Sequence, residues 1–326
     1  MLCIQNKNTD PYFNLAAEEY ILKNFQDDCF MLYQNENSII VGKHQNTLSE
    51  INLDFVNEND IKVVRRISGG GTVFHDLGNL NFSFFMSGED GKLVNFKKYT
   101  RPILEFIQNS GIEAEFGKRN DLVIDGKKIS GNAEHIWKKK TLHHGTILYS
   151  SELSHLSSAL KVNPLKFADK SVKSVRSRVT NLCDYLPVKM DISVFSEKLM
   201  THIMEKYSVG ELYDFSERDI KEIKALKNKK FVSWEWNFGY SPNYNFKKTV
   251  KVNFGNLSVN LKTIKGVISE IEFSSEFIQK DNLREIEGVL HGKKHDRDII
   301  KAFLENYMKD NNLNGIAIDE MLKALF

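Results

Sequence analysis

The chain has few cysteines and prolines and no long apolar run, and each shortage argues against a class of protein. Its three cysteines, Cys3, Cys29 and Cys183, are far apart and odd in number, so the spacing suggests neither a disulfide framework nor a zinc site. We therefore expect a reducing, cytoplasmic location. Five prolines and no low-complexity stretch leave no obvious linker. No apolar stretch approaches the about 20 residues of a membrane helix, and the N-terminus lacks a signal-peptide pattern.

The charges are nearly balanced. Lysine and arginine number 45 and aspartate and glutamate 43, which gives a formal net charge of +2. We therefore expect neither nucleic acid nor a membrane as a partner. The length of 326 residues suffices for two domains or one large one.

Short helices and strands are interspersed without regular strand–helix–strand alternation, so we expect an α+β fold with mixed or mostly antiparallel sheets flanked by helices. The expected helices cover residues 14–25, 102–110, 194–207, 216–227, 282–290 and 296–307. The expected strands cover residues 30–33, 38–42, 61–64, 79–86, 122–124, 128–130, 146–149, 247–254, 256–264 and 267–273. We place a domain boundary after the aromatic, turn-rich segment Trp234 to Pro242, which gives a large domain of residues 1–246 and a small α+β domain of residues 247–326.

The most informative stretch is RRISGGGTVFHD, from Arg65 to Asp76. Three consecutive glycines lack Cβ atoms, so their backbone N–H groups can approach a bound anion closely. The arginines can pair with a carboxylate or phosphate through parallel hydrogen bonds. The alternative is a glycine hairpin loop with surface arginines.

A second polar cluster surrounds Asp121 and Lys128. Asp121 ends a turn that leads into a strand, where a carboxylate can hold Mg²⁺ on a nucleotide. Lys128 alternates with the apolar Ile129, so Lys128 faces a cleft or solvent if Ile129 faces the core. The alternative for Lys128 is an ordinary exposed lysine.

Two further polar segments have more than one interpretation. His143 and His144 are adjacent, so on a strand they cannot both line one pocket, and either is a structural histidine in the alternative interpretation. The segment from Lys170 to Leu182 holds four cations and four hydroxyl residues. It is either a solvated basic strand or a loop that closes over a polyanionic ligand.

Together these segments resemble the lipoate–protein ligase A family in its two-domain bacterial form. The resemblance rests on RRISGGGTVFHDLGNLNFS, RNDLVIDGKKISGNA, HHGTILYS and KSVRSRVTNL in this order, with NLAAEEYIL and SIIVGKHQNTLSEIN before them. It covers essentially the whole chain. It implies a biotin/lipoate ligase-like catalytic domain at 1–246, which binds lipoate and ATP, and an accessory domain at 247–326.

The resemblance also implies the chemistry. Lipoate (or octanoate) and ATP, with Mg²⁺ as activator, give lipoyl-AMP and pyrophosphate. The lipoyl group then passes to a lysine of an apo lipoyl carrier domain, in a 2-oxo acid dehydrogenase acyltransferase subunit or the glycine cleavage H protein. No permanent prosthetic group is implied. The first step needs cations, because a carboxylate and a phosphate repel each other.

The resemblance assigns roles to residues of this sequence. The KxSG spacing makes Lys128 the catalytic lysine, in contact with both the lipoate carboxylate and the α-phosphate, and Asp121 the metal ligand. The implied lipoyl-binding residues are Arg66, Ser68, Gly71, His75, His144, Leu15 and Tyr33, with Ala16 beside the tail. The implied ATP- or adenylate-binding residues are Gly69, Gly70, Thr72, Val73, Phe74, Asn79, Asn120, Asp121, Lys128, Thr146, Lys173, Ser174, Val175 and Arg176. Plain core positions are the alternative for Leu15, Ala16 and Tyr33.

Two other functions are compatible with this resemblance. A lipoyl or octanoyl transferase of the same fold lacks its own adenylation activity and uses a cysteine nucleophile, which needs a lowered thiol pKa. None of the three cysteines stands where the transferases place theirs. A non-catalytic lipoate- or nucleotide-binding paralogue is the second alternative, and the intact Lys128 and Asp121 argue against it.

Overall fold

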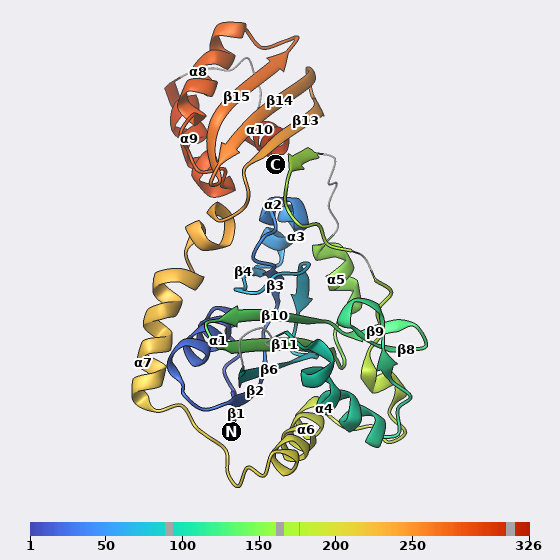
Figure 1. Cartoon of the computed structure of the whole chain (residues 1–326). Coiled ribbons are helices and arrows are strands. Elements are labelled where there is room, and N and C mark those ends of the chain that lie inside the picture. The colour runs from blue at the N-terminus through green and yellow to red at the C-terminus, as the bar shows by residue number, and fades with distance from the viewer. Residues whose placement is uncertain (89–93, 161–165, 176, 311–316) are drawn as a thin grey trace. The chain divides into compact units, whose positions relative to one another are not determined.

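The computed structural model describes residues 1–88, 94–160, 166–175, 177–310 and 317–326 (Figure 1). The chain divides into two compact units. The first holds Met1–Lys43, Phe55–Leu160 and Ser174–Ser233, and the second holds His44–Asp54, Lys161–Lys173 and Trp234–Phe326.

The first unit is built on a five-stranded mixed sheet with the order β1-β2-β6-β11-β10. Its strands are β1 (Leu2–Gln5), β2 (Cys29–Gln34), β6 (Asn79–Ser87), β11 (Lys140–Leu148) and β10 (Asn132–Trp137). Only the β1–β2 pair is parallel in this sheet. The mixed, mostly antiparallel arrangement confirms the expected α+β class.

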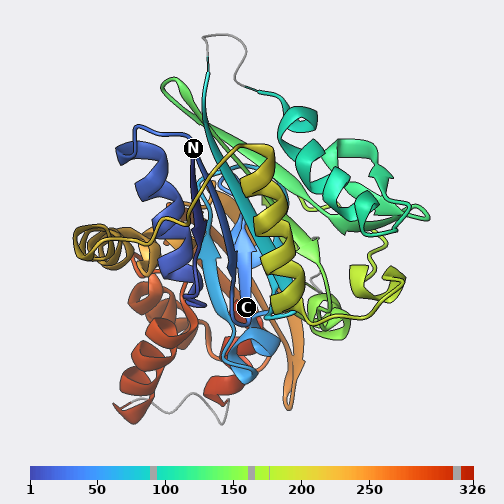
Figure 2. The ribbon, with the colours of Figure 1, turned by 90° about the horizontal axis from the view of Figure 1, so that it is seen from below.

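The two faces of β6 differ in character, and both are buried. Leu80, Phe82 and Phe84 pack into a core with α4 (Phe96–Asn109) and α6 (Ile192–Lys206), and Figure 2 shows α6 lying along the sheet. The opposite face carries Asn79, Asn81 and Ser83, which are at most 2% exposed. A polar face of an antiparallel sheet normally meets water. The polar groups of this buried face therefore need hydrogen-bond partners other than bulk water.

Two small sheets and several helices complete the first unit. One sheet has the order β4 (Lys62–Arg65), β3 (Ser38–Val41), β5 (Val73–His75), and the other the order β7 (Glu115–Phe116), β8 (Leu122–Ile124), β9 (Lys127–Ser130). The helices of this unit not yet given are α1 (Pro11–Asn24), α5 (Leu153–Ala159) and α7 (Glu217–Leu226), with a π-helical turn at Lys227–Phe231. A short helix, α3 (Leu53–Glu58), begins at the junction of the two units.

The second unit has its own sheet and core. The sheet order is β12 (Phe167–Asp169), β13 (Tyr244–Val252), β14 (Gly255–Ile264) and β15 (Val267–Ser275), all antiparallel. Its helices are α2 (Thr47–Glu50), α8 (Lys280–Leu290), α9 (Arg297–Asp310) and α10 (Ile318–Leu325). The last three pack against the sheet through apolar residues that include Leu283, Ile300 and Leu322.

Several elements differ from the expected ones for identifiable reasons. Helix α1 begins at Pro11, because the Asp10 side chain accepts a hydrogen bond from Tyr12 N and Pro is favoured in the first turn. Helix α4 begins at Phe96, where Asn95 caps it, so Pro102 lies inside the helix and not at its start. Strand β10 and helix α10 were not expected.

No helix among the described residues is both long and apolar enough to cross a membrane.

Candidate active site

The loop after β4 is shaped by the buried Arg66. Its Nε donates to Ser68 Oγ at 3.1 Å, its Nη1 to Ile40 O at 3.0 Å, and its Nη2 to Gly69 O at 2.7 Å and Gly71 O at 2.8 Å. Burial lowers the pKa of Arg66 to about 10, so the guanidinium stays charged at neutral pH. The alternative interpretation of this segment, a glycine hairpin loop with surface arginines, is therefore wrong. Arg66 holds the loop from inside, so most of its donors serve protein carbonyls and not a ligand.

The glycines leave their backbone donors available. Among the described residues, no hydrogen-bond partner is found for the N–H groups of Gly69, Gly70 and Gly71. Gly70 has φ +94°, and a Cβ there would come 2.9 Å from Arg66 Nη2. This position therefore requires glycine for both conformation and space. Successive free N–H groups form a cradle for an anion.

Ser68, His144 and Glu18 are joined side chain to side chain in a row of close polar contacts, which we call the relay. Ser68 Oγ lies 2.6 Å from His144 Nε2. His144 Nδ1 lies 2.9 and 3.0 Å from the two carboxylate oxygens of Glu18. Glu18 also accepts hydrogen bonds from Tyr33 OH at 2.9 Å and Ser83 Oγ at 2.6 Å. Tyr33, Ser83 and His144 lie on the buried polar face of the sheet. Glu18 faces them from α1, and Ser68 from the loop.

Sequence reasoning missed Glu18. Burial by itself raises the pKa of its carboxyl, but the interactions with His144, Ser83 and Tyr33 outweigh burial and leave that pKa below its ordinary value. Glu18 is thus a fully buried carboxylate on the inner face of α1, one turn from Leu15. The available signal was a charged residue on the apolar face of a helix opposite the alternating polar positions of β6.

His75 presents a fixed donor. Its Nδ1 lies 3.0 Å from Asn35 Nδ2, and Asn35 Oδ1 in turn accepts from Asn14 Nδ2 at 2.8 Å. Because Nδ1 accepts, the proton of the neutral ring is on Nε2. That buried Nε2 has no partner among the described residues. Burial and the Arg66 charge lower the pKa of His75 to about 3, which keeps it neutral.

Lys128 lies at the start of β9, and backbone hydrogen bonds fix its position. Its N–H donates to Arg178 O at 2.8 Å and its carbonyl accepts from Thr180 N at 3.1 Å. Its ammonium group lies 2.9 Å from Asp121 Oδ1. Ile129 is fully buried, whereas the Lys128 side chain is a quarter exposed. The alternation that put Ile129 in the core and Lys128 outside it is confirmed.

The surroundings of Asp121 offer oxygen ligands. Asn120, in a left-handed turn at φ +64°, accepts from Asn132 Nδ2 through its carbonyl at 2.8 Å. The buried Asn132 Oδ1 has no partner among the described residues. One carboxylate and neighbouring amide oxygens suit Mg²⁺, which takes one or two carboxylates together with substrate phosphates. Among the described residues no group of three His, Cys, Asp or Glu side chains could hold a metal by itself.

The buried face of the sheet continues the site. Asn79 Nδ2 donates to Asn81 Oδ1 at 3.0 Å, and the other polar atom of each amide is buried without a partner among the described residues. Thr146 lies opposite Asn81 in the β6–β11 ladder, and its Oγ1 accepts from Gly131 N at 3.3 Å. The predicted Asn79 and Thr146 therefore belong to the surface that carries His144.

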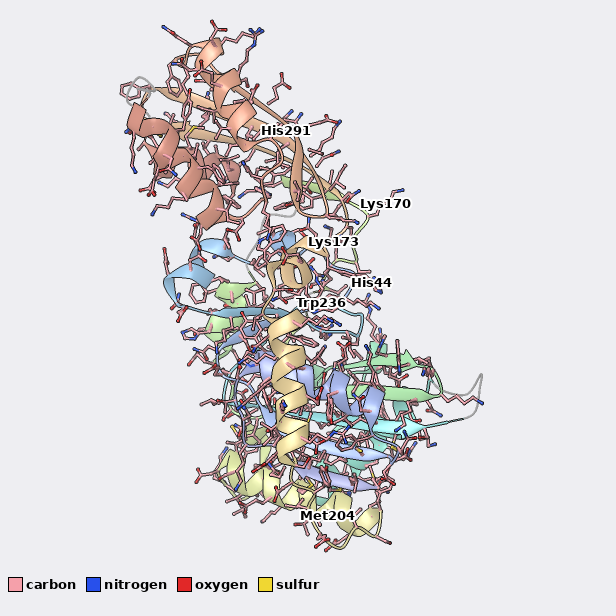
Figure 3. The ribbon with its side chains drawn as sticks, turned by 90° about the vertical axis from the view of Figure 1, so that its left-hand side faces the viewer. His44, Lys170, Lys173, Met204, Trp236 and His291 are labelled. Atoms are coloured by element: carbon pink, nitrogen blue, oxygen red, sulfur yellow. The ribbon has the colours of Figure 1, made fainter. Side chains whose placement is uncertain are left out.

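The remaining predicted residues divide between the two units. Thr72 N donates to Ser174 Oγ at 2.9 Å in the first unit, where Phe74 is buried and Val175 exposed. Val73 begins β5. Lys173, labelled in Figure 3, belongs to the second unit, where its ammonium group pairs with Asp169 Oδ1 at 2.9 Å. Arg176 lies outside the described residues.

Two predictions about histidines and thiols have clear outcomes. His143 and His144 do point to opposite faces: His143 bonds Glu134 and Thr100 within the aromatic core. The thiols are protonated, because burial raises the pKa of Cys3 to about 11 and that of Cys29 to about 12. Burial and Asp184 also raise the pKa of Cys183.

Comparison with known proteins identifies the family. A family model described as the lipoyl protein ligase A/B catalytic domain matches residues 10–204, and one described as the bacterial lipoate protein ligase C-terminus matches residues 241–325. The lipoate-protein ligase LplJ of Bacillus subtilis is 39% identical over 331 residues, which cover 100% of both chains.

Two solved structures share the fold. A lipoate-protein ligase A bound with ATP is 28% identical, with a TM-score of 0.62 over 73% of this chain and 98% of that one. A putative lipoate protein ligase from T. acidophilum with bound lipoic acid is 27% identical, with a TM-score of 0.61 over the same shares. The chain therefore belongs to the lipoate–protein ligase family and is a ligase with that family's catalytic and C-terminal domains.

Proposed function

We propose that this protein activates lipoate with ATP to lipoyl-AMP, with release of pyrophosphate, and then transfers the lipoyl group to a lysine of a carrier protein. The observation that carries this proposal is the placement of Lys128. Two backbone hydrogen bonds, to Arg178 O and from Thr180 N, tie it to one neighbouring segment, and its ammonium group lies 2.9 Å from Asp121 Oδ1. A fixed cation there offsets the repulsion between lipoate and the α-phosphate and stabilises charge in both transfers.

The other residues take complementary roles in this proposal. The free N–H groups of Gly69, Gly70 and Gly71 cradle the phosphate end of the mixed anhydride. His75 Nε2–H, a buried neutral donor, bonds the acyl oxygen. Glu18, His144 and Tyr33 lie beside the acyl chain, with Leu15 and Ala16 at its tail.

Asp121, together with the phosphates, would hold Mg²⁺. Asp121 keeps one carboxylate oxygen against Lys128, so its second oxygen and Asn132 Oδ1, which has no partner in the described part of the chain, would be the protein ligands of the ion. The ion supplies charge neutralisation on the phosphates when bound. No permanent prosthetic group takes part.

The partners follow from the reaction. The protein substrate is an apo lipoyl carrier domain, of a 2-oxo acid dehydrogenase acyltransferase subunit or of the glycine cleavage H protein. Residues 1–246 carry the chemistry and residues 247–326 are accessory. Neither nucleic acid nor a membrane is a partner. The three free thiols suit a cytoplasmic location.

Lipoate-dependent exchange between ATP and labelled pyrophosphate tests this proposal. A ligase exchanges label and then modifies an apo carrier domain. An octanoyl transferase without adenylation activity shows no exchange, and neither does a non-catalytic paralogue. Absence of exchange would therefore refute the proposal.

A further inference from the structure

The relay of Ser68, His144 and Glu18 has the order of groups that activates a serine for acyl transfer. A hydroxyl lies 2.6 Å from one imidazole nitrogen, and a carboxylate lies 2.9 Å from the other. The carboxylate fixes the tautomer by taking the Nδ1–H bond, so that in the neutral ring Nε2 accepts the Ser68 proton. Hydroxyl, base and orienting carboxylate in contact are the recognisable parts of a nucleophilic serine site.

Two further features complete such a site. Arg66 Nε donates to Ser68 Oγ at 3.1 Å, so a cation stands beside the oxygen where negative charge would develop. The N–H groups of Gly69 and Gly70, for which the described residues provide no partner, follow Ser68 directly. Backbone donors next to the nucleophile are where an oxyanion is stabilised in acyl transfer.

We propose that Ser68 is a nucleophile and that this protein hydrolyses activated esters of medium-chain carboxylic acids without ATP. Ser68 Oγ attacks the acyl carbon, an Oγ–C bond forms, and the Ser68 proton moves to His144 Nε2. The bond between the acyl carbon and the leaving oxygen breaks, and a phenol or another weakly basic alcohol leaves as its oxygen takes the electron pair and the proton held on His144 Nε2. Water then attacks the acyl-serine, gives its proton through His144, and releases the carboxylic acid while Ser68 regains its proton.

The inference rests on the proposed function in one respect, that the acyl group binds in contact with Ser68. It goes beyond that function because ligation by direct attack of a carrier lysine needs no acyl-enzyme.

A second set of hydroxyl, histidine and carboxylate groups in the molecule provides a comparison. Thr100 Oγ1 lies 3.1 Å from His143 Nε2, and His143 Nδ1 lies 2.9 Å from Glu134 Oε1. This second set is enclosed in the aromatic core, where His143 packs against Phe82, Phe84 and Tyr99, so it should be inert.

Reaction of the full chain with a fluorophosphonate tests the inference, because this reagent phosphonylates only activated serines and loses fluoride. Peptide mass spectrometry should find the adduct on Ser68, and the protein should hydrolyse p-nitrophenyl octanoate in the absence of ATP. Glu18→Gln should slow labelling at least about tenfold, since loss of the orienting carboxylate costs a serine protease far more. Thr100→Val should leave the labelling rate unchanged.

Three results would each overturn the inference: no adduct on the wild-type chain, an adduct elsewhere, or ester hydrolysis that persists in Ser68→Ala. The wild-type labelling result stands even if Ser68→Ala fails to fold. Pyrophosphate exchange is measured on the same samples. Normal exchange without a Ser68 adduct removes only the serine chemistry, whereas an adduct without exchange removes only the ligase proposal.

Discussion

Gly131 leaves the space into which Lys128 folds: a Cβ built on Gly131 would come 2.6 Å from Lys128 Nζ and 2.8 Å from its Cε. The same Cβ would stand 3.8 Å from Asp121 Oδ1. A side chain at position 131 would thus displace the end of Lys128, the side chain three residues before it, and no left-handed backbone is involved.

Gly131→Ala should therefore displace the Lys128 ammonium group from Asp121. We expect ligation to fall by about one to two orders of magnitude, because small misplacements of a positioned group are costly. Adenylation is measured by pyrophosphate exchange and transfer by lipoylation of an apo carrier domain. Gly210→Ala, where a Cβ meets nothing within 4 Å, is the control. Equal activity of the two variants would show that Gly131 does not position Lys128.

Lys128→Ala should fold normally and lose several orders of magnitude in lipoylation, which corresponds to about 3–5 kcal/mol of transition-state stabilisation. The neighbouring Lys127 is exposed and lies 3.5 Å from Tyr185 OH, so Lys127→Ala is the matched control. Activity retained in Lys128→Ala and lost in Lys127→Ala would mean that the wrong lysine was assigned.

His75 should make the folded state sensitive to acid. Burial and the charge of Arg66 lower its pKa from 6.5 to about 3. Above pH 6.5 the ring is neutral in both the folded and the unfolded chain, so it does not make the free energy of unfolding depend on pH. As the pH falls from 6.5 towards 3, only the unfolded chain takes up the proton, so stability is lost at about 1.4 kcal/mol per pH unit.

Thermal unfolding at pH 6.5, 5.5 and 4.5 checks this. His75→Asn keeps a polar group towards Asn35 and cannot titrate, so its melting temperature should fall less steeply with acid than that of the wild type. His291→Asn, at an exposed position, should keep the wild-type pH dependence. Parallel curves for the wild type and His75→Asn would contradict the assignment.

The thiols should be dispensable. Cys3 and Cys29 are buried with strongly raised pKa values, so neither supplies a thiolate at neutral pH. The triple variant Cys3→Ala, Cys29→Ala, Cys183→Ser should ligate within about tenfold of the wild type, a barrier change of about 1.4 kcal/mol or less. A thioester trapped on any of the three during turnover would favour the transferase instead.

The sequence by itself determined the α+β class, the family and most strand positions. Lys128 could be separated from Lys127 and Ile129 because spacing and alternation are local properties of the chain. The separation of His143 from His144 onto opposite faces followed from the same period of two along a strand. These inferences needed no partner from elsewhere in the chain.

Only the tertiary structure decided what those residues contact. The sequence offered no role for Glu18, yet this side chain is buried against His144, which is 126 residues away. Arg66 was predicted from the sequence as a lipoyl-binding residue, and only the structure shows that its Nη2 donates to the carbonyls of Gly69 and Gly71 in its own loop. Whether a charged side chain meets water, a ligand or a distant carboxylate depends on which segments pack over it. That packing is set by long-range contacts across sheets, on which local periodicity carries no information.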